Sequence, residues 1–196
     1  MQNANKTRGT GPLGGAGMVG LWGASSLVRS MQAGTMTASY PTNATGTITA
    51  VDTANSIVFL LGLTQSNANT NYAVVAGGIE LTNSTTVTGY QSPSGGVDMV
   101  FSFVVVEFHP GIVKSLQAGT IAVGANASAT ATVTAVNTAK SMLVWRGFKM
   151  STVAAPNTDS WATKCVLTNS TTVTANRITA DANNNITAYF GLVEFF

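Results

Sequence analysis

The octapeptide LTNSTTVT occurs twice in this chain, at residues 81–88 and 167–174. An identical run of this length marks an internal duplication, and further blocks match in the same order. The spacing between matching blocks grows only from 85 to 87 residues along the chain, so the insertions fall in loops. The other matching blocks are VRSMQAGT (28–35) with VKSLQAGT (113–120), TITAVDTANS (47–56) with TVTAVNTAKS (132–141), and VEF (106–108) with VEF (193–195).

The duplication sets the domain organisation. We predict a glycine-rich N-terminal arm (1–27), a first repeat (28–108), a linker (109–112) and a second repeat (113–196). Each repeat, at roughly 80 residues, is long enough for a modest hydrophobic core. A duplicated small domain usually builds surfaces and assemblies, whereas an active site needs residues that one copy has and the other can lack.

Short segments rich in Val, Ile, Thr, Phe and Tyr, separated by Asn, Gly, Ser and Pro clusters, predict strands throughout both repeats. No stretch sustains a helical period. We therefore predict an all-β chain of two tandem small antiparallel β-sandwiches, with a barrel or jelly-roll variant as the alternative. The expected strands are 28–38, 46–52, 56–63, 72–80, 84–90 and 98–108, then 113–122, 130–137, 141–149, 162–168, 171–178 and 185–195.

Local patterns assign roles to some repeated residues. Alternation across 47–52 predicts a half-buried strand. In LTNSTTVT, Leu81 ends one strand in the core, the Asn-Ser pair turns the chain and Val87 re-enters the core. Gly34 and its counterpart Gly119 predict a bulge or a close backbone approach.

Charged residues make up 8% of the chain, against roughly 25% in a typical soluble domain. A polar, uncharged surface of this kind is typical of proteins that pack against copies of themselves. The net charge of +2 and the lack of any Lys/Arg run argue against a nucleic-acid partner.

The two repeats carry opposite charge. Residues 28–108 hold one base against four acids, and residues 109–196 hold six bases against three acids. This asymmetry suggests that the first repeat of one subunit meets the second repeat of a neighbour. The alternative is drift after duplication.

The arm is apolar and rich in glycine. Six glycines and one proline within residues 11–24 make it a poor membrane-spanning helix. The string GTGPLG (9–14) matches a dinucleotide-binding pattern, but no strand precedes it, so we expect no cofactor there. We predict that the arm docks onto a partner subunit, with anchors Leu13, Met18, Leu21 and Trp22.

The residues that could carry chemistry are few. His109 lies in the linker without a nucleophile placed beside it, and Cys165, the single cysteine, is expected to pack as a small hydrophobe. The scattered carboxylates have no metal-ligand spacing, so no catalytic or metal site is predicted.

Two further candidates have competing interpretations. Glu107 and Glu194 occupy equivalent positions and are expected to cap backbone groups or to pair with Arg29 and Lys114, rather than to act as a catalytic pair. Trp161 has no counterpart in the first repeat, and it is a candidate ligand contact, for instance with a sugar ring, or a local packing residue.

The blocks VxSxQxGT, TxTAVxTAxS, LTNSTTVT and VEF resemble β-rich repeat domains in structural proteins of tailed bacteriophages, including tail-fibre, baseplate and capsid-decoration proteins. The resemblance covers both repeats and leaves the arm uncovered. It implies a place in the virion, with other virion proteins as partners, and it supplies no catalytic residue.

Three functions follow as hypotheses. The first is a virion structural protein that is tail-associated or, alternatively, decorates the capsid; a homotrimer of two-repeat chains would form a pseudo-sixfold ring. The second is a carbohydrate-binding module or adhesin for a host surface glycan, which needs exposed aromatics near Trp161 or Tyr90. The third, an enzyme, has the least support.

Overall fold

The computed structural model describes residues 27–65, 76–92, 98–150, 163–183 and 185–196. These residues are all-β, with antiparallel strands and two 3-10 turns, η1 (Thr53–Asn55) and η3 (Thr138–Lys140), which confirms the predicted fold class. The first repeat holds β1 (Val28–Ala38), β2 (Ala44–Thr47), β3 (Ser56–Gln65), β4 (Gly77–Asn83), β5 (Thr86–Gln91) and β6 (Met99–Phe108). The second holds β7 (Val113–Gly124), β8 (Ser128–Thr132), β9 (Ser141–Met150), β10 (Lys164–Asn169), β11 (Thr172–Asn176) and β12 (Ile186–Phe195).

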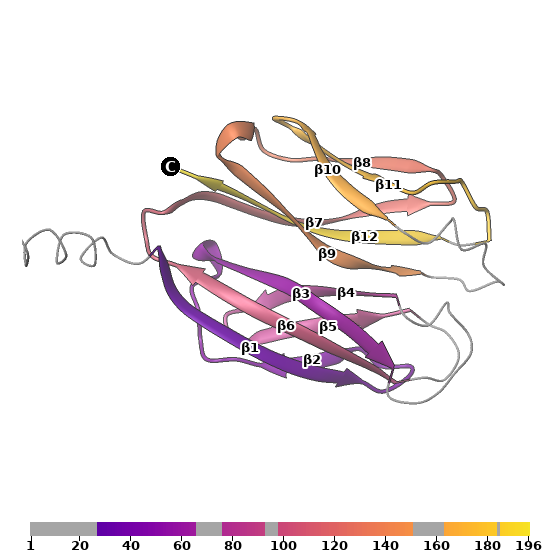
Figure 1. Ribbon diagram of the computed structural model, residues 1–196, viewed down its shortest axis with the longest axis horizontal. Coiled ribbons are helices and arrows are strands. Elements are labelled where there is room, and N and C mark those ends of the chain that lie inside the picture. Colours follow the sequence, from indigo (N-terminus) through magenta and orange to yellow (C-terminus); the bar gives the residue numbers. More distant parts are fainter. Residues whose placement is uncertain (1–26, 66–75, 93–97, 151–162, 184) are drawn as a thin grey trace, which may run out of the picture.

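Each repeat forms two facing layers of three strands. In the first repeat, β1-β6-β3 packs against β2-β5-β4, and in the second, β7-β12-β9 packs against β8-β11-β10 (Figure 1). The strand orders therefore correspond one to one between the repeats. A contact between β4 and β9 joins two of these layers into a single six-stranded sheet with the order β2-β5-β4-β9-β12-β7.

Each sandwich has its own core, built from the inward side chains of both layers. Phe101 and Ile79 are fully buried in the first core, and Ile121 and Leu192 take this role in the second. A phenyl ring covers a glycine in each repeat, because a Cβ on Gly34 would lie 2.8 Å from Cζ of Phe103. The predicted close approach at this glycine is thus to an aromatic ring, and β1 pairs with β6 there without a bulge.

The LTNSTTVT segments form the strand-turn-strand element that their sequence predicts. Oδ1 of Asn83 accepts hydrogen bonds from the backbone N (2.9 Å) and the hydroxyl (3.1 Å) of Thr85, and this geometry closes the turn between β4 and β5. Asn169 and Thr171 repeat the same bonds between β10 and β11. Val87 and Val173 then enter the two cores with no exposed surface.

The predictions of strands over 46–52 and 130–137 are wrong beyond Thr47 and Thr132, where β2 and β8 end. Beyond Thr47 the chain runs along the β4–β5 turn, where Ile48 N donates to Thr85 O (2.9 Å). The Gln32 side chain replaces a neighbouring strand: its Nε2 donates to Thr49 O (3.0 Å) and its Oε1 accepts from Thr49 N (2.7 Å). Gln117 and Thr134 form the same pair of bonds in the second repeat, which explains the repeated glutamine of the VxSxQ block and the early end of β8.

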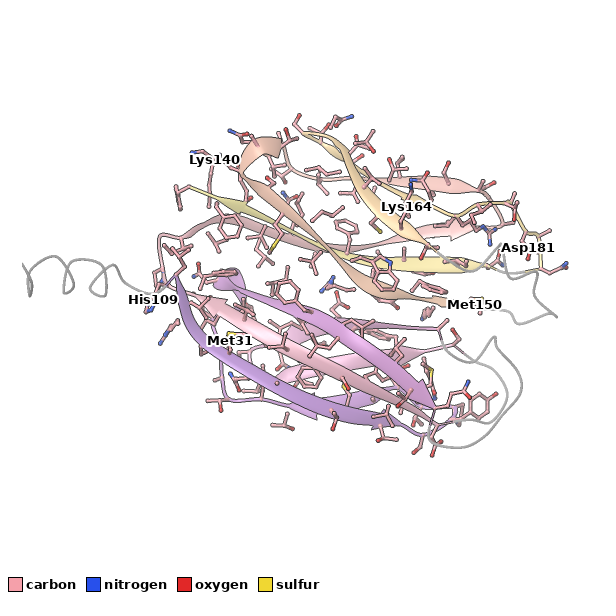
Figure 2. The ribbon with its side chains drawn as sticks, viewed as in Figure 1. Met31, His109, Lys140, Met150, Lys164 and Asp181 are labelled. Carbon is pink, nitrogen blue, oxygen red and sulfur yellow. The ribbon has the colours of Figure 1, made fainter. Side chains whose placement is uncertain are left out.

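The two repeats lie one above the other, and the chain passes between them at one end of the molecule, where His109 is located (Figure 2). A third apolar cluster fills their boundary. Its buried members come from β3, β6, β9 and β12 and from the first residue of β7, and the linker residue Ile112 packs against them. They are Ile57, Val106, Phe108, Val113, Val144 and Val193. The outward faces of the β3 and β9 layers are therefore apolar because they pack against each other.

Candidate assembly surface

The Glu107 carboxylate organises the first repeat from a buried position. It accepts hydrogen bonds from Arg29 Nη1 (3.0 Å), Ser30 Oγ (2.9 Å) and the backbone N of Asp52 (3.1 Å). These bonds tie β1, β6 and the turn before η1 together. The structural interpretation of this residue is thereby confirmed.

Glu194 has the same position and the same three kinds of partner in the second repeat. It accepts from Lys114 Nζ (2.8 Å), Ser115 Oγ (3.3 Å) and the backbone N of Asn137 (2.9 Å). The hydrogen bond from Lys114, followed by that from the Asn137 backbone, lowers the pKa of Glu194 below its ordinary value. Each glutamate is held within its own repeat, so the two do not form a pair.

His109 and Cys165 have structural surroundings. The backbone N of His109 donates to Leu27 O (3.1 Å), and its carbonyl accepts from Ile112 N (3.2 Å), which shapes the turn between the repeats. Cys165 packs against the second core, and burial raises the pKa of its thiol to about 11. Its predicted role as a small hydrophobe is confirmed.

Within the part of the chain that the structure describes, no cluster of three His, Cys, Asp or Glu side chains could hold a metal ion. No helix among these residues has the length and apolar character to cross a bilayer. The predicted arm anchors Leu13, Met18, Leu21 and Trp22, and the candidate ligand contact Trp161, lie outside the described residues.

The joint between β4 and β9 is the place where the first repeat meets the second edge to edge. Gly78 pairs with Gly147, which has a φ of +94°. A Cβ on Gly147 would lie 2.1 Å from the carbonyl oxygen of Gly77, and a Cβ on Gly78 would lie 2.2 Å from the Tyr189 ring. Both positions therefore require glycine, one for its backbone angle and both for the close approach.

A buried arginine crosses this joint. Arg146 Nη2 on β9 donates to the carbonyl of Phe190 (2.6 Å) and lies 3.9 Å from Oε1 of Glu80 on β4. Burial lowers the pKa of Arg146, while Glu80 opposes that shift through its negative charge. The ion pair thus helps to keep a buried guanidinium charged where the two repeats meet.

Aromatic rings complete the joint. Tyr90 on β5 stacks on Tyr189 of β12, with ring centroids 5.3 Å apart and an interplanar angle of 17°. The Tyr90 hydroxyl donates to Glu80 Oε2 (3.3 Å), and Lys149 Nζ lies 5.6 Å from the Tyr90 ring centroid. Side chains of the second repeat therefore cover the end of the β4–β5 outer face at Gly78 and Tyr90, whereas Thr82 at the other end is exposed.

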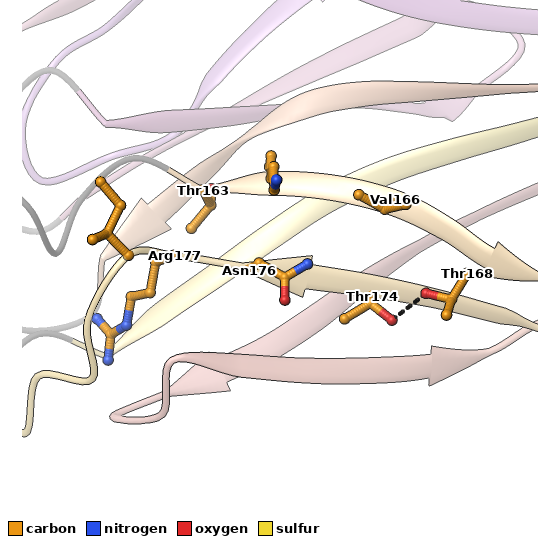
Figure 3. Close-up of a pocket in the computed structure, with 8 residues that line it drawn as sticks. Thr163, Val166, Thr168, Thr174, Asn176 and Arg177 are labelled. Carbon is orange, nitrogen blue, oxygen red and sulfur yellow. Dashed lines mark hydrogen bonds between the residues drawn. The ribbon is translucent and has the colours of Figure 1, made fainter.

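No described residue covers the corresponding outer face of the second repeat, which forms a groove of about 720 Å³ over β10 and β11 (Figure 3). Val166 is 42% exposed and Ile178 is 74% exposed, which is high for aliphatic side chains. The Thr168 and Thr174 hydroxyls are hydrogen-bonded to each other along the groove. Its lining residues are Thr163, Lys164, Val166, Thr168, Thr174, Asn176, Arg177 and Ile178.

Arg177 is fixed at one end of this groove. Its Nε donates to Asn126 O (2.7 Å), and its Nη2 donates to Gly124 O (3.0 Å) and Asp181 O (3.1 Å). The guanidinium therefore ties three loop carbonyls together. These hydrogen bonds fix the Arg177 side chain, which forms one end of the groove.

The β10–β11 groove in the second repeat is equivalent in sequence to the β4–β5 outer face in the first repeat. At a spacing of 86 residues, Lys164, Val166 and Asn176 of the groove match Gly78, Glu80 and Tyr90 of the covered face. The groove is thus the second-repeat version of the surface that the first repeat uses to hold β9 and β12. Sequence reasoning identified neither surface, because a strand pattern does not indicate which outer face is covered.

Comparison of this chain with protein-family models, with curated proteins and with solved structures found no match in any of the three.

Proposed function

We propose that this chain is a non-enzymatic structural component of a bacteriophage virion: a tail-associated fibre, baseplate or adaptor protein that assembles through its arm and its β-rich repeats. One observation carries the assembly role. The second repeat covers one end of the β4–β5 outer face, whereas no described residue covers the equivalent end of the β10–β11 face. This open surface is suited to binding a further subunit. The bacteriophage assignment rests on the resemblance of the repeated motifs.

The use of the repeated polar residues supports a structural role. Gln32, Asn83 and Glu107, which are identical in the second repeat, each hydrogen-bond to backbone atoms of their own repeat. Residues that the duplication kept are thus engaged in forming the fold. The low charge of the chain, at 8% of residues, fits a protein whose surface is packed against other subunits.

The proposal is tested by quantitative mass spectrometry of purified phage particles. We expect this chain in the particles at a low copy number that fits one or a few rings, with antibody label at the tail in electron micrographs. A copy number that follows the capsid lattice would instead support the decoration alternative. Absence from washed particles would overturn the virion proposal.

The arm has a separate test. Deletion of residues 2–24 should weaken assembly, because the predicted apolar anchors would be lost. Assembly and thermal unfolding would be measured for the shortened and the full-length chain. Unchanged assembly with unchanged unfolding would remove the arm from the proposal.

The carbohydrate-binding alternative needs an exposed aromatic ring at Trp161 or Tyr90, and the contacts of Tyr90 argue against that residue. Tyr90 is stacked on Tyr189, and its ring is thereby engaged within the chain. The lining of the β10–β11 groove contains no aromatic side chain among the described residues, whereas sugar recognition commonly uses one. Binding to a glycan array that disappears in the Trp161→Ala variant would favour this function over the structural one.

A further inference from the structure

We propose that the open groove over β10 and β11 binds the β3 edge of a second copy of this chain, and that this head-to-tail contact repeats the β4–β9 joint between molecules. The inference rests on the proposed function, because it names the partner for the open surface. Both strands are suited to such a contact: β3 and β10 are the last strands of their three-stranded sheets, with backbone groups on one side unpaired by any described strand.

The repeat equivalence identifies the residues that would meet. Strand β3 corresponds to β9 at a spacing of 85 residues, so Leu61 takes the place of Arg146 and Gly62 that of Gly147. On the groove side, Val166 takes the place of Glu80. An ion pair inside the chain thus becomes a contact between Leu61 and Val166. These two aliphatic side chains are 63% and 42% exposed in the single chain.

The sizes of the side chains also exchange in a complementary way. Inside the chain, Gly78 leaves room for the large Tyr189 ring. In the proposed contact the same two positions hold Lys164 and Ser102, so a large side chain on the groove meets a small one on the incoming layer. The small and large residues have thus exchanged sides between the joint inside the chain and the proposed contact, so the combined size of the two side chains stays suited to close packing.

Gly62 supplies an independent observation. A Cβ at this position would meet no atom within 4 Å, and the φ of Gly62 is not positive. No contact or backbone angle among the described residues therefore requires glycine there, and Gly62 follows the point at which the register of β3 on β6 shifts. Its counterpart Gly147 requires glycine because it approaches the backbone of Gly77 in the joint. The glycine at position 62 is explained if it makes the same close approach to a second copy.

The net charges of the repeats agree with this pairing. The first repeat holds an excess of three acids and the second an excess of three bases, so a head-to-tail contact places repeats of opposite net charge side by side, although β3 itself has no charged residue. Because β3 and β10 are different surfaces, each added chain leaves one of each free. The assembly is then either a closed ring or an open filament.

Charge exchange at the contact tests this proposal in the full-length chain. Leu61→Arg or Val166→Glu alone should weaken association by at least about tenfold, because each buries an unpaired charge. The double variant should recover association by forming the pair that Arg146 and Glu80 form within the chain. Thr45→Arg on β2 is the control, since it adds the same charge at an exposed position on another strand.

Sedimentation and thermal unfolding would be measured for all of these variants. Both altered side chains are substantially exposed, so unfolding should stay near that of the wild type. The proposal is overturned if the single variants associate like the wild type, or if the double variant associates no better than they do. Gly62→Ala should also lose association without losing stability, and retained association would count against the contact.

Directional cross-linking provides the deciding measurement. In a Cys165→Ala background, chains with Leu61→Cys are mixed with chains with Val166→Cys and oxidised. We expect disulfide-linked dimers in the mixture and none with either variant alone, whereas self-linking of each variant without mixed dimers would overturn the head-to-tail contact. If the chain is found in virions but the mixed dimers do not form, the head-to-tail contact is wrong and the proposed function stands. If the mixed dimers form but the chain is absent from virions, the proposed function is wrong and the contact stands.

Discussion

The Arg146 guanidinium lies 3.9 Å from the Glu80 carboxylate and donates a 2.6 Å hydrogen bond to the carbonyl of Phe190. This one side chain therefore connects β9 with β4 and with β12. Because Arg146 lies at the boundary, we expect the stability of each repeat to depend on the other. Leu61 and Val166 occupy the positions equivalent to Arg146 and Glu80. These apolar residues indicate which substitutions the joint should accept.

Replacing the ion pair by its apolar counterparts should show strong coupling. Glu80→Val leaves the buried Arg146 without its counter-charge, and we expect it to lower the free energy of unfolding by about 1–3 kcal/mol. Arg146→Leu should cost a similar amount, while the double variant should lie closer to the wild type than the sum of both losses. Urea unfolding of the four proteins measures this coupling. Additive losses would show that the two residues act independently.

The Glu194 network predicts a dependence of stability on pH. The folded state holds the pKa of this carboxyl below its ordinary value, so the ionised carboxylate stabilises the fold at pH values above about 4.3. That stability is lost as the pH falls through the lowered folded-state pKa. Glu194→Gln should therefore be less stable than the wild type at neutral pH, and the difference should shrink in acid. A difference that does not change with pH would contradict this account.

The Gln32 side chain should stabilise the first repeat through two backbone bonds. Gln32→Ala removes both bonds to Thr49, and at about 0.5–1.5 kcal/mol per net hydrogen bond we expect the free energy of unfolding to fall by about 1–3 kcal/mol. Gln32→Glu is the matched control, because its carboxylate still accepts from Thr49 N but cannot donate to Thr49 O. Its unfolding free energy should fall between those of the wild type and the alanine variant. Equal stability of all three proteins would exclude this role.

The two equivalent glycines should respond differently to alanine. Gly147→Ala places a Cβ 2.1 Å from Gly77 O at a positive φ, and we expect it to lower the free energy of unfolding by at least about 2 kcal/mol. Gly62→Ala places a Cβ in open space and should leave the unfolding of the single chain unchanged or slightly improved. Thermal unfolding at low protein concentration compares them. A loss at Gly62 equal to that at Gly147 would be inconsistent with the structure.

Local sequence patterns predicted the all-β class, most strand positions and the LTNSTTVT turn, because each depends on neighbouring residues. They failed at 48–52, where the alternation of Ile48 and Thr49 is typical of a strand. There a distant side chain, Gln32, supplies the bonds that a neighbouring strand would give. A pattern of period two cannot distinguish these two sources of hydrogen bonds.

The candidate surface could not be predicted for a related reason. Aligning the two copies pairs Arg146 with Leu61 and Glu80 with Val166, but only the fold shows that Arg146 and Glu80 face each other. The differences between the repeats point to a contact only when the structure has shown that one of the two residue pairs is in contact.

The mass of the full-length wild-type chain in solution, measured by sedimentation across a range of concentrations, tests the assembly claim most directly. We expect species at multiples of the 20.1 kDa chain, whose mass either grows with concentration or stops at one closed ring. A single species of 20.1 kDa throughout that range would contradict it.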